Sequence, residues 1–405
     1  MKRVSAKVGW AMRLRVLLFV AAVLIPLAGL QLSCTGLQPA KDRFQLSWSE
    51  LSAHAGGAKG AVQLTTGEIL ATRTVWRSQE AAVTCSRSTN GGTHWEDISV
   101  IAKGRTGQDL GDGHLAQLPN GALLFSYRHN QTQPDETGRP RYSIRTAISH
   151  DAGQTWQPHA FVAESGLDPA KEPKALRGLW SSFLLQKRNG TLQCYYDDED
   201  TPHQAGFFRH QWITMKTWDT NSQQWVNPVT VSRAHEPQHL SRDGMASVLE
   251  LPSGQLLCVL ESVQTAPPHA NCLRLVSSND GGRTWSWQRD ERRILYQASK
   301  PNHLTVSPWV CRLSTGPLVC VFATDEDQPS SSPPGTPPWY LETDVKCVLS
   351  FDAGRSWSPI AQPIYSGTHH CYAPGILPLR DGSLLVTCED FSISGHRAFR
   401  GVTAP

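Results

Sequence analysis

The 405-residue sequence predicts an all-β protein, a six-bladed β-propeller with four strands in each blade. Two internal repeats carry this prediction. The first is an octapeptide, Ser-x-Asp-x-Gly-x-Thr-Trp, which occurs in four versions. The second is a short apolar strand, a tight turn with Gly, and a strand rich in Leu, Val and Cys; it occurs six times, with turn glycines 54 to 69 residues apart. A charged content of 18% beside 32 Gly and 27 Pro is typical of many short strands joined by turns.

The octapeptide has the chemistry of a hairpin turn. Its Asp or Asn can accept hydrogen bonds from backbone N–H groups of the turn, and its Gly allows a positive φ at which a Cβ would clash. The closing Trp is large enough to anchor the turn between sheets. We therefore expect the acidic residue to be structural rather than catalytic. The four copies are Ser88–Trp95, Ser149–Trp156, Ser278–Trp285 and Ser350–Trp357.

Each of the six repeats marks one blade, because the turn Gly joins the first and second strands and the octapeptide joins the third and fourth. The third repeat has only a degenerate octapeptide near Thr220–Trp225, and the sixth ends at Pro405 without one. The alternating stretch Arg43–Leu51 supplies the missing strand. We expect it to complete the last blade and close the ring, which hides an exposed strand edge. The turn glycines are Gly67, Gly121, Gly190, Gly254, Gly316 and Gly382.

The N-terminus is typical of an export signal. Five basic residues precede an apolar run from Val16 to Leu30, which is too short for a comfortable membrane span. The run ends in Leu30-Gln-Leu-Ser-Cys34, which resembles a bacterial lipoprotein signal with Cys34 as the lipidated residue. Ordinary secretion with cleavage near Cys34–Gly36 and an uncleaved anchor are the alternatives. We therefore expect a signal peptide (1–33), a linker (34–42) and a propeller (43–405), located in the periplasm or outside the cell, free or attached to the membrane through Cys34.

Composition excludes several function classes. The formal net charge of +3 includes the five N-terminal cations, so the remainder is near neutral and predicts neither nucleic acid nor an anionic membrane surface as a partner. The cysteines show no CxxC or Cys/His ligand spacing, so we expect no metal site. Most of them are expected to be small buried apolar residues. We expect a monomer without a cofactor.

Propeller geometry indicates where functional residues lie. The ends of the second strands and the starts of the first strands share the face opposite the turns, and the first strands surround the axis. All three long insertions, 129–141, 197–210 and 326–342, follow a second strand, so loops suited to binding crowd this face. Counting seven residues beyond each turn Gly predicts the inner rim: Thr74, Arg128, Asp197, Glu261, Ala323 and Glu389.

Charged and aromatic side chains gather at this rim. Any single rim carboxylate is more often a solvated or salt-bridged surface group. Several carboxylates at one funnel mouth, however, repel one another unless something uses them. Such a cluster with Arg, His, Tyr and Trp could hold a sugar, and paired carboxylates could serve as nucleophile and acid/base. Trp76 and Trp180 are expected stacking platforms. The expected substrate-binding residues are Arg73, Asp112, His114, Arg128, Trp180, Arg242, Asp243, Tyr372 and Glu389.

The octapeptides and the six-blade register resemble the Asp boxes (BNR repeats) of the sialidase superfamily across almost all of the chain after the signal. By this resemblance, sialidase activity would require three Arg for the substrate carboxylate, an Asp acid/base and a Tyr nucleophile activated by Glu. Tyr372 with Glu261 could mimic the Tyr/Glu pair. The Arg-Ile-Pro stretch of sialidases is replaced here by Gly57-Ala-Lys-Gly60, and beside Arg128 and Arg242 no arginine triad is visible.

The exo-arabinanase branch of the same fold is more similar at the rim. These retaining enzymes use two Glu, one after the second strand of blade three and one at the same place in blade four. Tyr195-Tyr-Asp-Asp-Glu199 and Leu257-Cys-Val-Leu-Glu261 occupy those positions, and Arg242-Asp-Gly-Met245 leads into blade four. The resemblance implies Glu261 as nucleophile and Glu199 as acid/base. Asp198 and Asp197 remain alternatives for the acid/base.

Together these features predict an exported, exo-acting, retaining glycoside hydrolase that releases terminal sugars from glycans or polysaccharides. Two alternatives stay open. One is an exo-α-sialidase. The other is a non-catalytic propeller that binds glycan or protein, because a fold does not certify a reaction.

Overall fold

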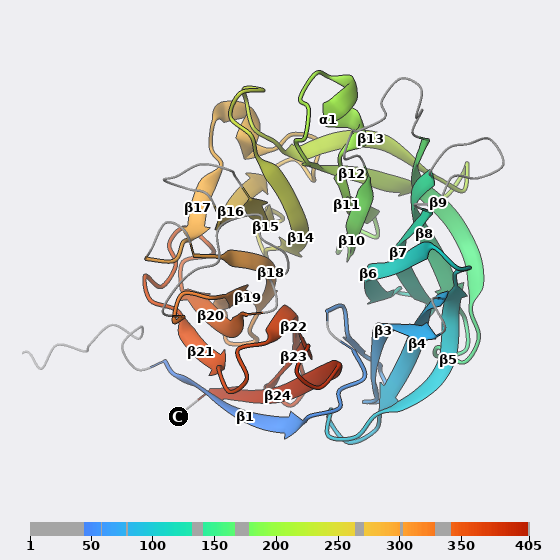
Figure 1. The fold of residues 1–405 in the computed structure, drawn as a ribbon, viewed down its shortest axis with the longest axis vertical. Helices are drawn as coiled ribbons and strands as arrows, with labels where there is room; N and C mark the ends of the chain where they lie inside the picture. Colours follow the sequence, from blue (N-terminus) through green and yellow to red (C-terminus); the bar gives the residue numbers. More distant parts are fainter. Residues whose placement is uncertain are drawn as a thin grey trace, which may run out of the picture. The chain divides into compact units, whose positions relative to one another are not determined.

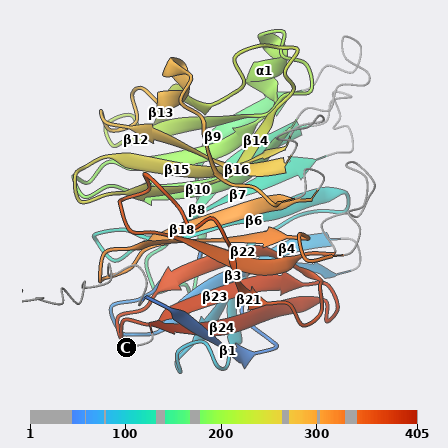
Figure 2. The same ribbon diagram turned by 90° about the vertical axis from the view of Figure 1, so that its left-hand side faces the viewer.

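The computed structural model describes residues 44–57, 59–77, 80–131, 141–166, 178–263, 271–299, 303–328 and 342–403. These residues form six sheets of four strands arranged around a ring (Figure 1). The ring is seen edge-on in Figure 2. The predicted all-β, six-bladed propeller is confirmed. The predicted signal peptide, Cys34 and the linker lie outside the described residues.

Each blade is an antiparallel sheet whose first strand lies nearest the axis. Blade one consists of β2 (Val62–Gln63), β3 (Ile69–Arg77), β4 (Glu80–Ser88) and β5 (Glu96–Lys103). Blade two consists of β6 (Gln108–Gln117), β7 (Leu123–Gln131), β8 (Arg141–Ser149) and β9 (Gln157–Gly166). Blade three consists of β10 (Leu179–Gln186), β11 (Leu192–Asp198), β12 (Trp212–Asp219) and β13 (Gln224–Ser232).

The second half of the ring repeats this plan. Blade four consists of β14 (Arg242–Glu250), β15 (Leu256–Val263), β16 (Asn271–Ser278) and β17 (Arg293–Tyr296). Blade five consists of β18 (Thr305–Arg312), β19 (Leu318–Thr324), β20 (Asp344–Ser350) and β21 (Gln362–Tyr365). Blade six consists of β22 (Cys371–Pro378), β23 (Leu384–Asp390), β24 (Gly395–Thr403) and β1 (Leu46–Ser52). Two short helices, α1 (Asp200–Gln204) and the 3-10 helix η2 (Ser286–Arg289), join strands of blades three and four.

The first strand of the chain closes the ring. β1 pairs antiparallel with β24, from Leu46 opposite Thr403 to Ser52 opposite Ala398. Figure 1 shows it as the outermost strand of the last blade. The Trp48 ring packs against the backbone of Gly401, where an added Cβ would lie 2.3 Å from the ring. The N-terminal strand therefore covers the edge of β24, as the sequence predicts.

The four octapeptides form the predicted turns between third and fourth strands. In the turn at Ser278–Trp285, the Ser278 hydroxyl accepts from the Gly282 N–H at 2.9 Å, and Asp280 accepts from the backbone and hydroxyl of Thr284. The Trp285 indole N–H donates to the Gly282 carbonyl at 3.1 Å, and its ring is fully buried. Gly282 has a φ of +97°, a conformation that residues with a Cβ rarely adopt. The acidic residue is thus occupied within its own turn.

Apolar side chains fill the space between neighbouring blades. The largest cluster joins blades three to six and includes Trp285 from the octapeptide of blade four. The nine cysteines after Cys34 are all buried. They pack as small apolar residues, as expected.

The face opposite the octapeptide turns carries the long connections. The segments between β7 and β8, between β11 and β12, and between β19 and β20 all follow the second strand of a blade. Only the second of these is described throughout, and it contains α1. Within the described ranges, no helix has the length and apolar character needed to cross a membrane.

Candidate active site

The central channel is closed by aromatic side chains. His114 on β6 stacks on Phe183 of β10, with ring centroids 4.2 Å apart, and meets Trp309 of β18 edge-on at 5.1 Å. These rings come from blades two, three and five, so their contact fills the axis. The backbone N–H of Leu184 donates to His114 Nδ1 at 3.0 Å. Burial lowers the pKa of His114 to about 4, so this predicted binding residue is a neutral part of the channel plug.

A bulge in the first strand of several blades points backbone N–H groups at the rim carboxylates. The strand register shifts between Gly244 and Ser247, and between Val306 and Trp309. Met245 and Ser307 lie in these bulges with left-handed backbones, at φ of 52° each. Ser307 N donates to Oε2 of Glu261 at 2.8 Å. Met245 N donates to both carboxylate oxygens of Asp197, at 3.1 and 3.2 Å. Each carboxylate is therefore held by the next blade.

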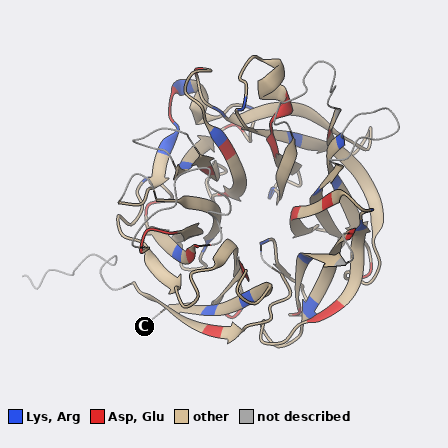
Figure 3. Ribbon diagram, in the orientation of Figure 1, with Lys and Arg blue, Asp and Glu red and all other residues tan. Residues whose placement is uncertain are grey.

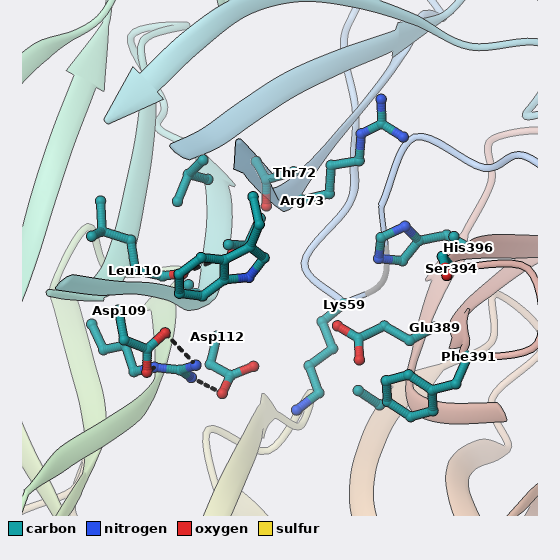
Figure 4. Close-up of a pocket in the computed structure, with 18 of the residues that line it drawn as sticks. Lys59, Thr72, Arg73, Asp109, Leu110, Asp112, Glu389, Phe391, Ser394 and His396 are labelled. Carbon is teal, nitrogen blue, oxygen red and sulfur yellow. Dashed lines mark hydrogen bonds and ion pairs between the residues drawn. The ribbon is translucent and has the colours of Figure 1, made fainter. Parts of the chain in front are cut away.

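Lys59 lies at the centre of the site. It belongs to the segment between β1 and β2, has a left-handed φ of 46°, and is only 8% exposed. Its Nζ lies 2.9 Å from Sδ of Met245. Burial lowers the pKa of Lys59, and the negative charges of Glu261, Glu389 and Asp197 oppose this. Figure 4 shows its side chain extending between Asp112 and Glu389.

A pocket of about 350 Å³ opens beside Lys59, between blades six, one and two (Figure 4). Its walls include four of the predicted substrate-binding residues, Arg73, Asp112, Arg128 and Glu389. The pocket is also lined by charged and imidazole side chains that were not predicted as binding residues: Lys59, Asp109, Asp390 and His396. Trp76, an expected stacking platform, also lines the pocket and is 58% exposed. A pocket of this size with an exposed indole suits a sugar.

The rim carboxyls have unusual proton affinities. Burial raises the pKa of Asp197 to about 8. The hydrogen bond from Met245 and the positive charge of Lys59 lower this pKa, while the charge of Glu261 raises it further. Burial also raises the pKa of Glu261, opposed by the Ser307 hydrogen bond and by Lys59 and Arg242. Burial also raises the pKa of Glu389, and the positive charges of Lys59 and Arg128 oppose this. A pKa of about 8 leaves Asp197 mostly protonated at neutral pH.

The other two acidic residues of blade three have different surroundings. Asp198 is buried and accepts hydrogen bonds from the N–H groups of Asp200 and Thr201 and from the hydroxyls of Thr201 and Thr214. These contacts tie α1 to the blade, and they do not favour Asp198 as a catalytic group. Glu199 is also buried and forms an ion pair with Arg242. Burial raises the pKa of Glu199, and Arg242 opposes this.

Several remaining rim residues serve the fold or contact neighbouring side chains. Asp243 is fully buried and accepts hydrogen bonds from Ser232, Ser241 and Arg292, so it joins a network inside the blade rather than the pocket. Trp180 is half-buried, with its ring 6.0 Å from that of Tyr142. Tyr372 stacks on Phe391, with centroids 6.5 Å apart. Of the two unassigned rim positions, Thr74 lines the pocket and Ala323 is buried.

The rim arginines are paired with acidic groups. Arg128 donates to both oxygens of Asp109, at 2.8 and 3.0 Å, and also pairs with Asp112. Arg242 pairs with Glu199 and donates to Gln211 at 2.9 Å. Arg73 pairs with Asp97 at 2.7 Å. Figure 3 shows acidic and basic residues on the strands around the centre of the ring. The site is therefore rich in carboxylates, and these three arginines are already neutralised.

The fold is shared with solved propellers. An α-L-arabinanase of Penicillium chrysogenum, in complex with arabinobiose, matches with a TM-score of 0.62 and 20% identity over 89% of this chain and 97% of that chain. The GH93 α-L-arabinofuranosidase of Fusarium graminearum, also in complex with arabinobiose, matches with a TM-score of 0.62 and 17% identity over 89% of this chain and 98% of that chain. Hadza microbial sialidase Hz136 matches with a TM-score of 0.57 and 16% identity over 86% of this chain and 65% of that chain. No protein-family model and no curated sequence matches. The chain thus shares the propeller fold of these arabinanase, arabinofuranosidase and sialidase structures.

Proposed function

We propose that the protein is an exo-acting glycoside hydrolase that releases a terminal neutral sugar. The observation that carries this proposal is the pair of rim carboxyls from adjacent blades, Asp197 and Glu261, each of which accepts a hydrogen bond from a backbone N–H of the next blade. One of them holds a proton at neutral pH, since the pKa of Asp197 is about 8. Glycoside hydrolysis needs one protonated and one ionised carboxyl, and Asp197 can supply the protonated one.

In this proposal Glu261 is the nucleophile. Its carboxylate attacks the anomeric carbon while Asp197 donates its proton to the glycosidic oxygen, so the leaving sugar departs as an alcohol. Asp197, now ionised, then takes a proton from water as that water attacks the anomeric carbon and releases Glu261. The product keeps the configuration of the substrate. A retaining pair is typically about 5–5.5 Å apart.

Asp197 is a better acid than the other carboxyls of blade three. Asp198 is occupied by hydrogen bonds to α1 and β12. Burial raises the pKa of Glu199 as well, but its carboxylate is engaged in an ion pair with Arg242. The same burial that raises the pKa of Asp197 keeps its proton available for transfer. Glu199 is therefore assigned to orienting Arg242.

Two features support a neutral sugar at a chain end. Anionic sugars need unpaired cations, and Arg128 and Arg242 are both paired with carboxylates. The rings of His114, Phe183 and Trp309, from three different blades, meet at the axis, which favours a site that takes a chain end over one that a polymer threads. The arabinose ligands of the matching arabinanase and arabinofuranosidase structures make arabinofuranosides the first substrates to test.

The test is hydrolysis of aryl arabinofuranosides, linear arabinan and aryl sialosides by the purified protein, with the configuration of the first product followed by ¹H NMR. Release of arabinose with retained configuration supports the proposal. Release of sialic acid would instead support the sialidase alternative. Inverted product would contradict the role of Glu261 as nucleophile.

A second candidate function is glycan binding without turnover. It is favoured by one observation: Trp76 and the pocket lie between blades six, one and two, and neither Asp197 nor Glu261 is among the residues that line that pocket. Binding of arabino-oligosaccharides with no release of sugar would support it.

Export through the N-terminal segment is part of our proposal, since polysaccharide substrates lie outside the cytoplasm. Cell fractionation tests it, and incorporation of labelled fatty acid in the parent protein but not in Cys34→Ser would identify Cys34 as the lipidated residue.

A further inference from the structure

The pocket between blades six, one and two contains polar side chains that the fold itself does not use. Glu389 on β23 and His396 on β24 lie opposite each other in the strand register, so their side chains share one face, and both line the pocket. Within the described ranges neither side chain makes a hydrogen bond, and His396 Nδ1 is buried without a partner. Enclosed polar groups usually have such partners. Both side chains therefore keep hydrogen-bonding capacity that a ligand can use.

The facing wall of the pocket is fixed by ion pairs. Arg128 donates to both carboxylate oxygens of Asp109, at 2.8 and 3.0 Å, and also pairs with Asp112. Figure 4 shows Asp109 and Asp112 across the pocket from Glu389 and His396. Carboxylate oxygens can each accept more than one hydrogen bond. Both walls thus offer acceptors for the hydroxyl groups of a ligand.

The chemistry of the lining fits one neutral sugar residue. Trp76 on β3 lines the pocket and is 58% exposed, so the apolar face of a sugar ring can stack on its indole. The volume of about 350 Å³ is at the lower end for ligand sites. The two arginines in the lining, Arg73 and Arg128, already pair with carboxylates. An anionic ligand would also be repelled by the carboxylates of both walls.

The pocket adjoins the residue that holds the proposed acid. Lys59 lines the pocket, and its Nζ lies 2.9 Å from Sδ of Met245. The backbone N–H of Met245 donates to both carboxylate oxygens of Asp197, at 3.1 and 3.2 Å. In the proposed reaction Asp197 protonates the oxygen that departs with the second sugar of the chain. That sugar therefore lies on the Asp197 side of the broken bond, toward which these contacts lead from the pocket.

We propose that this pocket is the leaving-sugar subsite. The terminal sugar is cleaved at Asp197 and Glu261, and the next sugar residue of the chain, which is neutral, occupies the pocket. Its ring lies on Trp76, and its hydroxyls form hydrogen bonds with Glu389 and His396. This inference rests on the proposed function, since it names the part of the substrate that the pocket holds. It also explains why neither Asp197 nor Glu261 lines the pocket.

Two substrates with different leaving groups test the subsite. Methyl α-L-arabinofuranoside and arabinobiose present the same terminal sugar and both release an alcohol, but only arabinobiose places a second sugar in the pocket. We expect Trp76→Ala to lower kcat/KM for arabinobiose about tenfold or more and to leave that for the methyl glycoside within about twofold. Trp76→Phe should recover most of the loss, because it keeps an aromatic ring. An equal loss for both substrates, or no loss for either, would overturn the inference.

Phe208→Ala is the matched control. Phe208 is 63% exposed and lies in the segment between α1 and β12, but it does not line the pocket. This variant should leave kcat/KM unchanged for both substrates, and a loss for arabinobiose equal to that in Trp76→Ala would also count against the subsite. Since Trp76 is exposed, Trp76→Ala should keep the unfolding midpoint of the parent protein.

A binding measurement separates this inference from the proposed function. In Glu261→Gln labelled with ¹⁵N-tryptophan, arabinotriose should shift the indole N–H signal of Trp76, which is identified by its loss in Trp76→Phe. A titration without this shift would contradict the subsite, whether or not the parent protein turns over arabinose. Absence of turnover in the parent protein would contradict the proposed function, while the titration would still decide whether the pocket binds sugar.

Discussion

The backbone N–H of Ser307, in blade five, donates a 2.8 Å hydrogen bond to Oε2 of Glu261, in blade four. Ser307 has a left-handed φ of 52°, and such a conformation costs on the order of 1–3 kcal/mol in a non-glycine residue. The bulge at Met245 holds Asp197 in the same way. The orientation of each candidate catalytic carboxyl therefore depends on how its blade packs against the next.

Asp197 and Glu199 can be distinguished by leaving-group dependence. We expect Asp197→Asn to lower kcat on linear arabinan by about 10²–10⁴-fold, because the leaving sugar alcohol needs a proton. The leaving group of a dinitrophenyl arabinofuranoside needs no proton. With this substrate, Asp197→Asn should lower the rate constant of glycosidic bond cleavage much less. Pre-steady-state and steady-state kinetics of both substrates measure this.

Glu199→Gln is the matched variant for that experiment. Glu199→Gln should lower kcat for both substrates to a similar degree, since Glu199 orients Arg242. The reverse pattern, with leaving-group dependence in Glu199→Gln alone, would move the acid/base role to Glu199.

The titration of Asp197 also predicts how stability changes with pH. Its pKa is about 8 in the folded protein and near its ordinary value of 3.8 in the unfolded chain. Between these values the folded protein keeps the proton and the unfolded chain loses it. The contribution of this group is fully present below about pH 4 and is lost as the pH rises toward 8, so the free energy of unfolding falls.

Asp197→Asn cannot titrate and should lack this component. Denaturant unfolding of both proteins between pH 4 and pH 9 measures the difference. Parallel stability curves would show that Asp197 is not protonated in the native state.

Ring closure by β1 can be tested at Gly401. Gly401→Ala places a Cβ within 2.3 Å of the Trp48 ring, so β1 must shift away from β24. We expect a loss of about 1–3 kcal/mol in the free energy of unfolding, as is typical for overpacking. Gly401→Ala in a Trp48→Ala background should recover most of this loss, and an equal loss in both backgrounds would contradict the packing explanation.

The octapeptide turns should contribute to stability rather than to chemistry. Trp285→Ala removes a fully buried indole and its hydrogen bond to the Gly282 carbonyl, which should cost about 3–5 kcal/mol. At a temperature where the variant remains folded, its kcat should match that of the parent protein. A selective loss of kcat without loss of stability would assign the turn a functional role.

Local periodicity made the fold predictable. The turn glycines all have positive φ, and each marks the same point in its blade. Counting from them placed Asp197, Glu261 and Glu389 at the rim, and the negative charges of all three oppose the lowering of the Lys59 pKa by burial. Alternation in Arg43–Leu51 was enough to predict the closing strand, observed at Leu46–Ser52.

The centre of the site was harder to predict. Lys59 precedes the short strand β2 in an irregular segment, so no repeat points to it. The one available signal was that it is the basic residue in the stretch Gly57–Gly60 that replaces the Arg-Ile-Pro of sialidases. His114 and Asp243 were expected to bind substrate because they lie near the start of first strands. Whether such a residue faces the pocket, the channel plug or the blade interior depends on the bulge in its strand.

The most direct test of the central claim compares the parent protein with Glu261→Gln on aryl arabinofuranoside and linear arabinan. Glutamine keeps an oxygen that can accept from the Ser307 N–H but is a poor nucleophile, so the fold should be preserved. We predict that the parent protein releases arabinose and that the variant loses about 10³-fold or more in kcat, with an unchanged unfolding midpoint. Turnover by the variant at the rate of the parent protein would contradict the account.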